Sequence, residues 1–215
     1  MSGTARRPLP RWEVMAALAD HRVLGIVRAA DPEGAVETSR RLLAAGLRCV
    51  EIAFTTPGAA EAIRVITGEA PADAVIGAGT ILDPADAAAA VEAGAAFLVA
   101  PDLRASVVRA AHHHGVPVLP GAGTVTEVRR ALRLGADAVK LFPASHLGPA
   151  WLRNVRAALP RIPVIPTGGV TAADVPDWIT AGAVACGIGS WLTEADDATS
   201  RQRVAQVLDA ARRAP

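Results

Sequence analysis

Residues 74–101 read AVIGAGTILDPADAAAAVEAGAAFLVAP and contain one complete copy of a pattern that recurs along the chain. The first apolar run is typical of a strand buried on both faces. Asp83 and Pro84 then supply a capping oxygen and a proline at the first helical position. Gly94 stands where the alanine-rich helix must end, and a second apolar run begins at Ala96. The stretch therefore predicts a strand, a helix and a second strand.

The same alternation occurs eight times along the 215 residues. Its spacing of roughly 20–27 residues leaves room for one helix and two short loops in each unit. The predicted strands begin at Val23, Leu47, Ala74, Ala96, Val116, Ala136, Pro163 and Ala183.

Helix boundaries are marked by capping residues and glycines. A capping oxygen precedes a proline at Asp31-Pro32, Thr56-Pro57 and Asp83-Pro84, and Thr124 and Glu127 have the spacing of a capping box. A glycine stands shortly before five of the predicted strands, where a helix must end, at Gly46, Gly94, Gly115, Gly135 and Gly182.

Eight such units favour an α/β protein with a single (β/α)8 TIM barrel. A doubly wound open sheet is the alternative, but it would need only five or six strands. Residues 1–215 are expected to form one domain, because single cores grow to roughly 250–300 residues. Met1–Ala19 and Arg201–Pro215 are predicted to be helices that close the ends of the barrel, the first as an N-terminal capping helix.

The composition excludes several classes of partner. The 22 basic and 21 acidic residues are spread along the chain with a net charge of +1, and no basic stripe predicts nucleic-acid binding. No apolar run has the form of a signal peptide or the length of a transmembrane helix, so no membrane association is expected. Cys49 and Cys186 lie inside apolar runs, which favours buried, reduced thiols and a cytoplasmic location.

Lys140 is the strongest chemical signal in the sequence. The active sites of such barrels lie at the carboxyl ends of the strands, and Lys140 interrupts an apolar strand there. It is the only lysine, since the other 21 basic residues are arginine. A primary amine can lose its proton and attack a carbonyl, which a guanidinium cannot do. The alternative is a buried structural lysine paired with a carboxylate.

Glu51 and Arg28 are the other charged candidates. Glu51 is the only charge in CVEIAF, and burial among apolar neighbours would raise its pKa and suit a general acid/base. Glu51 can instead serve only as an ionic partner of Lys140 or Arg28. Arg28 ends the first strand and can clamp a substrate carboxylate or form a salt bridge at the rim.

PTGG (166–169) and GIGS (187–190) end the last two strands. Glycine amides at this place in a barrel often bind a phosphate, although plain tight turns would have the same sequence. No metal or other cofactor is expected, since the chain has no HExxH or CxxC spacing. His112, His113 and His114 would point about 100° apart on a helix and are predicted to form its solvated end.

Motifs in a consistent order, from about Val23 to Leu192, resemble the 2-keto-3-deoxy-6-phosphogluconate aldolases, also known as 4-hydroxy-2-oxoglutarate aldolases. They are VEIAFTTP (50–57), IGAGTILDP (76–84), VAPDL (99–103), PVLPGAGTVTE (117–127), VKLFPAS (139–145), IPTGGV (165–170) and CGIGSWL (186–192). The resemblance implies a class I aldolase that needs no metal and forms a homotrimer. Its substrate would be a small keto-acid phosphate, cleaved to pyruvate and glyceraldehyde 3-phosphate.

The resemblance also implies roles for particular residues. Lys140 would form the Schiff base, Glu51 would be the acid/base, and Thr80 and Thr167 would contact pyruvate. Phe142, in the same motif as Lys140, is expected among the substrate-binding residues. The phosphate-binding residues would be Gly168, Gly169, Gly189 and Ser190.

One position departs from the pattern of some members. Thr55 stands where they place an arginine that holds the substrate carboxylate, and the resemblance gives that role to Arg28. This variant occurs also among relatives that act on the galactonate epimer, so both epimers are candidate substrates. A phosphate-binding barrel without a covalent lysine and an inactive trimeric scaffold are the remaining alternatives.

Overall fold

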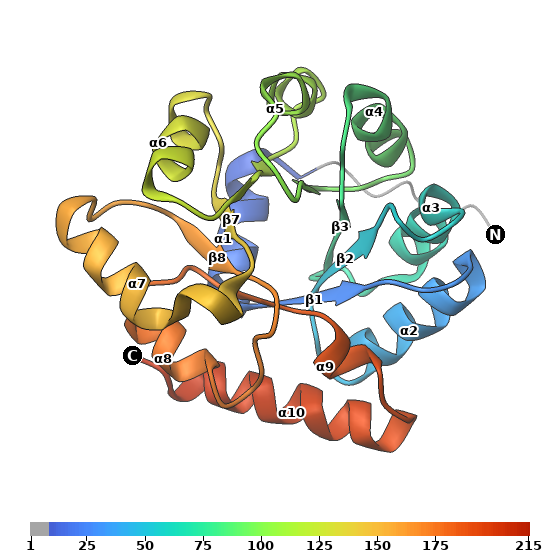
Figure 1. The fold of residues 1–215 in the computed structure, drawn as a ribbon. Helices are drawn as coiled ribbons and strands as arrows, with labels where there is room; N and C mark the ends of the chain where they lie inside the picture. Colours follow the sequence, from blue (N-terminus) through green and yellow to red (C-terminus); the bar gives the residue numbers. More distant parts are fainter. Residues whose placement is uncertain (1–8) are drawn as a thin grey trace.

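The computed structural model describes residues 9–215. Strands and helices alternate along the chain, as predicted, and Figure 1 shows most of the helices arranged around the strands. The strands are β1 (Val23–Val27), β2 (Cys49–Ala53), β3 (Val75–Gly79), β4 (Leu98–Val99), β5 (Val118–Leu119), β6 (Gly121–Ala122), β7 (Val139–Leu141), β8 (Val164–Pro166) and β9 (Cys186–Ile188). The helices are α1 (Arg11–His21), α2 (Pro32–Ala44), α3 (Ala59–Glu69), α4 (Pro84–Glu92), α5 (Ala105–His113), α6 (Val125–Arg133), α7 (Ala144–Ala158), α8 (Val175–Thr180), α9 (Ser190–Thr193) and α10 (Asp197–Arg213).

The named strands pair in parallel, in the orders β5-β4-β3-β2-β1-β9 and β6-β7-β8. The fifth predicted strand is divided into β5 and β6 at Pro120, which has no N–H to donate to a ladder. A parallel bridge between Thr167 and Gly187 and a hydrogen bond from Val184 N to Val164 O (2.9 Å) join the segments of β8 and β9. The predicted α/β class with parallel strands is confirmed.

Two groups of buried side chains form the core. The larger group lies between the strands and the outer helices and includes Ile52, Ile63 and Leu98. In the smaller group, Val14 and Leu18 of α1 pack against strand residues such as Val75. Figure 1 accordingly shows α1 behind the strands and not in the outer layer.

The two terminal helices differ in extent from the prediction. The first helix begins at Arg11 and runs to His21, and the part of the prediction on residues 1–8 lies outside the described residues. The last helix begins at Asp197, earlier than predicted, because Asp196 Oδ1 caps it by accepting from Thr199 N (2.8 Å).

The predicted caps are correct with one exception. Asp31 and Asp83 cap α2 and α4, and Thr124 and Glu127 form the capping box of α6. Thr56-Pro57 was wrong as a helix start, because α3 begins at Ala59 and the Thr56 hydroxyl accepts instead from Ala29 N (3.1 Å). The five glycines predicted to end helices all have positive φ, between 75° and 104°.

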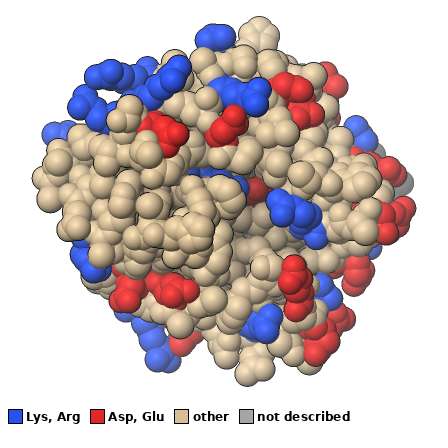
Figure 2. Space-filling model, viewed as in Figure 1, with Lys and Arg blue, Asp and Glu red and all other residues tan. Residues whose placement is uncertain are grey.

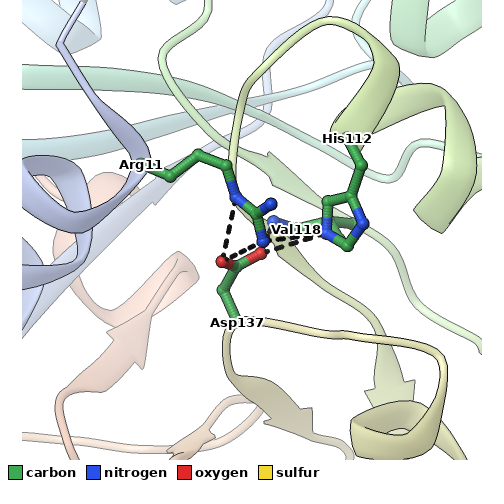
Figure 3. Close-up of polar contacts among 4 residues, drawn as sticks. All are labelled: Arg11, His112, Val118 and Asp137. Atoms are coloured by element: carbon green, nitrogen blue, oxygen red, sulfur yellow. Dashed lines mark hydrogen bonds and ion pairs between the residues drawn. The ribbon is translucent and has the colours of Figure 1, made fainter.

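Arg11 ties the start of α1 to the segment before β7, as Figure 3 shows. Its Nη2 donates to Asp137 Oδ1 (2.6 Å) and lies 3.0 Å from His112 Nε2. Asp137 Oδ2 also accepts from Val118 N (2.9 Å). Because a guanidinium can only donate, His112 Nε2 accepts. The prediction of a solvated histidine cluster was therefore wrong for His112, which is a half-buried part of this network.

Both cysteines are buried and free. Burial raises the pKa of Cys49 and of Cys186 to about 12, so neither thiol is a candidate nucleophile at neutral pH. Within residues 9–215, every helix is too short or too polar to cross a bilayer.

Candidate active site

Lys140 and Glu51 meet although their strands are not neighbours. Lys140 lies in β7 and Glu51 in β2, and these strands belong to different sheets. Nevertheless Lys140 Nζ is 3.9 Å from Glu51 Oε1, and the two side chains are only 9% and 1% exposed. Both side chains therefore point toward one another from the two sheets. The predicted pair is brought together.

The surroundings of Glu51 favour its neutral form. Neither carboxyl oxygen has a hydrogen-bond partner among the described residues. Burial raises the pKa of Glu51, and the positive charges of Lys140 and Arg28 offset only part of that rise. A carboxyl group of this kind can exchange a proton with a bound substrate near neutral pH.

Gly79 makes room for Glu51 and was missed by the sequence predictions. Gly79 ends β3, which pairs with β2, and a Cβ atom at this position would collide with the Glu51 carboxyl group. The sequence does show a glycine near the end of an apolar run, and a glycine in a strand often marks a place where another group approaches the backbone closely. The approaching group is not visible in the sequence.

Arg28 lies at the mouth of the site, where Thr55 orients it. Arg28 Nε donates to Thr55 Oγ1 (2.9 Å), which leaves both terminal nitrogens of the guanidinium outside that bond. The backbone of the same loop is held by the bond from Ala29 N to the buried Thr56 hydroxyl. Thr55 stands where some members of the resembling family place an arginine, and here it restrains Arg28, which directly follows β1.

Thr80, Thr167 and Phe142 all lie at strand ends. Thr80 directly follows β3 with φ of 58°, a strained conformation for a β-branched residue. Thr167 is buried beside Gly187, where a Cβ atom would strike its hydroxyl. The Phe142 ring lies 5.5 Å from Lys140 Nζ and is 42% exposed. The structure places these three residues at the same end of the strands as Lys140.

The predicted phosphate-binding residues divide into two groups. Gly169, Gly189 and Ser190 line one hollow of about 410 Å³. Gly168 is absent from that lining, and a Cβ atom there would lie 3.0 Å from the Phe142 ring. Gly168 and Gly169 have φ of 93° and 78°, conformations that favour glycine. The hollow is also lined by Trp191, Glu194 and Arg203, which the sequence predictions missed.

Figure 2 shows this face of the molecule hollowed near its centre, with basic and acidic atoms visible at the floor. Side chains of both signs line the rim. Within residues 9–215 no three His, Cys, Asp or Glu side chains gather in a way that could hold a metal ion. The chemistry that the described side chains themselves offer is that of an amine and a carboxyl group.

Comparison with known proteins adds independent findings. The family model for KDPG and KHG aldolase matches residues 14–207. A 2-dehydro-3-deoxy-phosphogluconate aldolase from Treponema pallidum is 39% identical over 184 residues, 85% of this chain and 87% of the relative. A 2-dehydro-3-deoxy-6-phosphogalactonate aldolase from Escherichia coli is 35% identical over 195 residues, 89% of this chain and 95% of the relative.

A solved structure is also similar over most of the chain. It is the KDPG aldolase from Legionella pneumophila with pyruvate captured at low pH as a covalent carbinolamine intermediate. The two chains superpose with a TM-score of 0.78 at 25% sequence identity, over 94% of this chain and 97% of the other.

Proposed function

This chain belongs to the KDPG and KHG aldolase family, and we propose that it is a class I aldolase with Lys140 as the Schiff-base residue and Glu51 as the acid/base. The observation that carries the proposal is the buried pair itself. A lysine amine lies 3.9 Å from a carboxyl oxygen that has no hydrogen-bond partner in the described structure. Such a carboxyl group can take the proton of the ammonium and so release a nucleophilic amine.

The proposed reaction begins when the Lys140 nitrogen adds to the C2 keto carbon of the substrate. The C2 oxygen takes one proton from the nitrogen and one from Glu51 and leaves as water, so that an iminium forms and Glu51 is ionised. Glu51 takes the proton of the C4 hydroxyl through a water molecule, the C3–C4 bond breaks, and its electron pair moves into the iminium to give an enamine. Protonation at C3 and hydrolysis then release pyruvate and restore the amine.

The Legionella relative supports this use of the lysine, since it holds pyruvate as a covalent carbinolamine. A non-covalent phosphate-binding barrel and an inactive scaffold are the rival functions. A binding site alone would give no reason to keep a lone lysine buried beside an unpartnered carboxyl group, where charge is costly.

Borohydride trapping tests the proposal. With pyruvate and borohydride, the intact mass is expected to rise by one reduced pyruvyl group, and peptide mapping is expected to place the group on Lys140. Arg161→Lys is the matched control, because it adds an exposed lysine that should stay unmodified under the same conditions. An unmodified Lys140, or equal modification of the added lysine, would refute the covalent mechanism.

We propose 2-keto-3-deoxy-6-phosphogluconate as the substrate, with glyceraldehyde 3-phosphate as the second product and 4-hydroxy-2-oxoglutarate as a further substrate. The relative with 39% identity carries the gluconate name, whereas the galactonate relative has 35% identity. Coupled assays of pyruvate release should therefore give the higher kcat/KM with the gluconate epimer. A higher kcat/KM with 2-keto-3-deoxy-6-phosphogalactonate would assign the chain to the galactonate enzymes.

Arg28 is the proposed partner of the substrate carboxylate. Its Nε is bound by Thr55, so the terminal nitrogens are free to form a bidentate pair. Thr80, Thr167 and Phe142 are proposed to contact the pyruvyl part of the substrate, because they lie at the strand ends around Lys140. Gly169, Gly189 and Ser190 are proposed to hold the phosphate because they line one hollow, and Gly168 is proposed with them from the family resemblance.

We further propose that the strands form one closed (β/α)8 barrel, with α1 as its N-terminal capping helix and residues 1–215 as one domain. The bridge between Thr167 and Gly187 supports closure, and the contact of Val14 with the inner strand residues supports the capping role. A homotrimer is proposed from the family resemblance. A cytoplasmic location is proposed from the two free, buried thiols.

A further inference from the structure

We infer that Arg203 is a specificity-determining residue that supplies the cationic partner of the substrate phosphate. The inference rests on the proposed function and deepens it. Arg203 belongs to α10, outside both glycine motifs, yet it lines the same hollow of about 410 Å³ as Gly169, Gly189 and Ser190. Among the residues that line the hollow it is the one basic side chain.

The Arg203 side chain is held in place by two contacts with Trp191. Its Nη1 donates to the Trp191 carbonyl oxygen (2.6 Å), and the guanidinium carbon lies 5.2 Å from the centre of the Trp191 ring. The cation–π contact and the hydrogen bond together restrain the guanidinium. These contacts leave Nε and Nη2 as donors, and a planar guanidinium can present two such donors to a phosphate.

The charges around the hollow define what it can bind. Glu194 lines the same hollow. Asp196 lies near Arg203. The hydrogen bond from the Thr199 backbone is the main cause that lowers the pKa of the Asp196 carboxyl, and the positive charge of Arg203 adds to the lowering. Asp196 is already used as the cap of α10. The glycine amides carry no net charge, so Arg203 must supply the attraction for a dianion and Glu194 opposes it.

A purely structural role is the rival explanation. Arg203 ties α10 to the residue after Ser190, and its loss could simply loosen that connection. If the role of Arg203 were purely structural, its loss would lower kcat/KM for every substrate by a similar factor. A phosphate-binding role predicts an effect that depends on the phosphate, and it predicts effects of opposite sign for the two charges that line the hollow.

The test compares Arg203→Gln and Glu194→Gln on 2-keto-3-deoxy-6-phosphogluconate and on the same keto acid without its phosphate. Arg203→Gln is expected to lower kcat/KM for the phosphorylated substrate by about 10- to 100-fold, mainly through KM, as for a lost charge-assisted hydrogen bond. The rate on the unphosphorylated acid should change by less than about twofold. Glu194→Gln should raise kcat/KM by about two- to threefold for the phosphorylated substrate alone.

Arg201→Gln, an exposed charge change on the same helix, is the matched control and should leave both rates unchanged. Titration with inorganic phosphate, followed by NMR, should show weaker binding in Arg203→Gln and gives a readout that does not depend on catalysis. Equal losses on both substrates, or unchanged phosphate binding, would overturn the role of Arg203. Failure of the proposed aldolase function would appear separately, as a wild-type Lys140 that pyruvate and borohydride do not modify.

Discussion

Lys140→Arg is expected to abolish aldol cleavage, with kcat lowered on the order of 10⁴-fold or more. The substitution keeps a positive charge near Glu51, so it preserves the electrostatics of the buried pair. It removes only the ability to lose a proton and attack the keto carbon, because a guanidinium stays protonated in proteins. A steady-state assay of pyruvate release, run at high enzyme concentration, measures the remaining rate.

The variant separates covalent catalysis from simple charge stabilisation. If Lys140 acted only as a fixed cation, arginine would retain much of the rate, and that result would contradict the Schiff base. Because a larger side chain at a site that is 9% exposed can disturb packing, Lys140→Met serves as the second variant. Both should keep the helical circular dichroism of the wild type, and neither should incorporate pyruvate on borohydride treatment.

Local sequence signals predicted the α/β alternation well because the interactions behind them are local. Asp31 caps the helix that follows it, as the sequence suggests, and the donor to its side chain, Gly34 N, lies only three residues away. Thr56-Pro57 has the same form but fails, since its hydroxyl is taken by Ala29 N, 27 positions earlier in the chain. A sequence motif shows that a side-chain oxygen is available, but it does not show whether a nearby or a distant backbone N–H will donate to that oxygen.

The same distinction explains which parts of the site could be predicted. Lys140 and Glu51 are visible because a charge inside an apolar strand is rare in any sequence. Gly79 is required only because the Glu51 side chain lies across the neighbouring strand. Arg203 is one of many arginines on helices, and only the packing of α10 against α9 places it in the hollow. Residues whose roles come from contacts between distant segments, such as these two, cannot be recognised from the sequence around them.

Glu51→Gln is expected to slow carbon–carbon cleavage by roughly 10²–10⁴-fold, the usual contribution of a positioned acid/base. Glutamine has nearly the same shape, so it fits beside Gly79, but it cannot accept the proton of the C4 hydroxyl. The fold should be retained. Glu61→Gln, which removes an exposed carboxylate on α3, is the matched control and should leave kcat unchanged.

The pH dependence gives a second readout of the same residue. Burial raises the pKa of Glu51, and the base must be ionised to take a proton. The wild-type rate should therefore fall as the pH drops through a value above the ordinary glutamate pKa of about 4.3. Because glutamine does not titrate, that limb should be absent from the residual activity of Glu51→Gln. A near-wild-type rate with an unchanged acid limb would mean that Glu51 serves only as the ionic partner of Lys140, and that another group moves the proton.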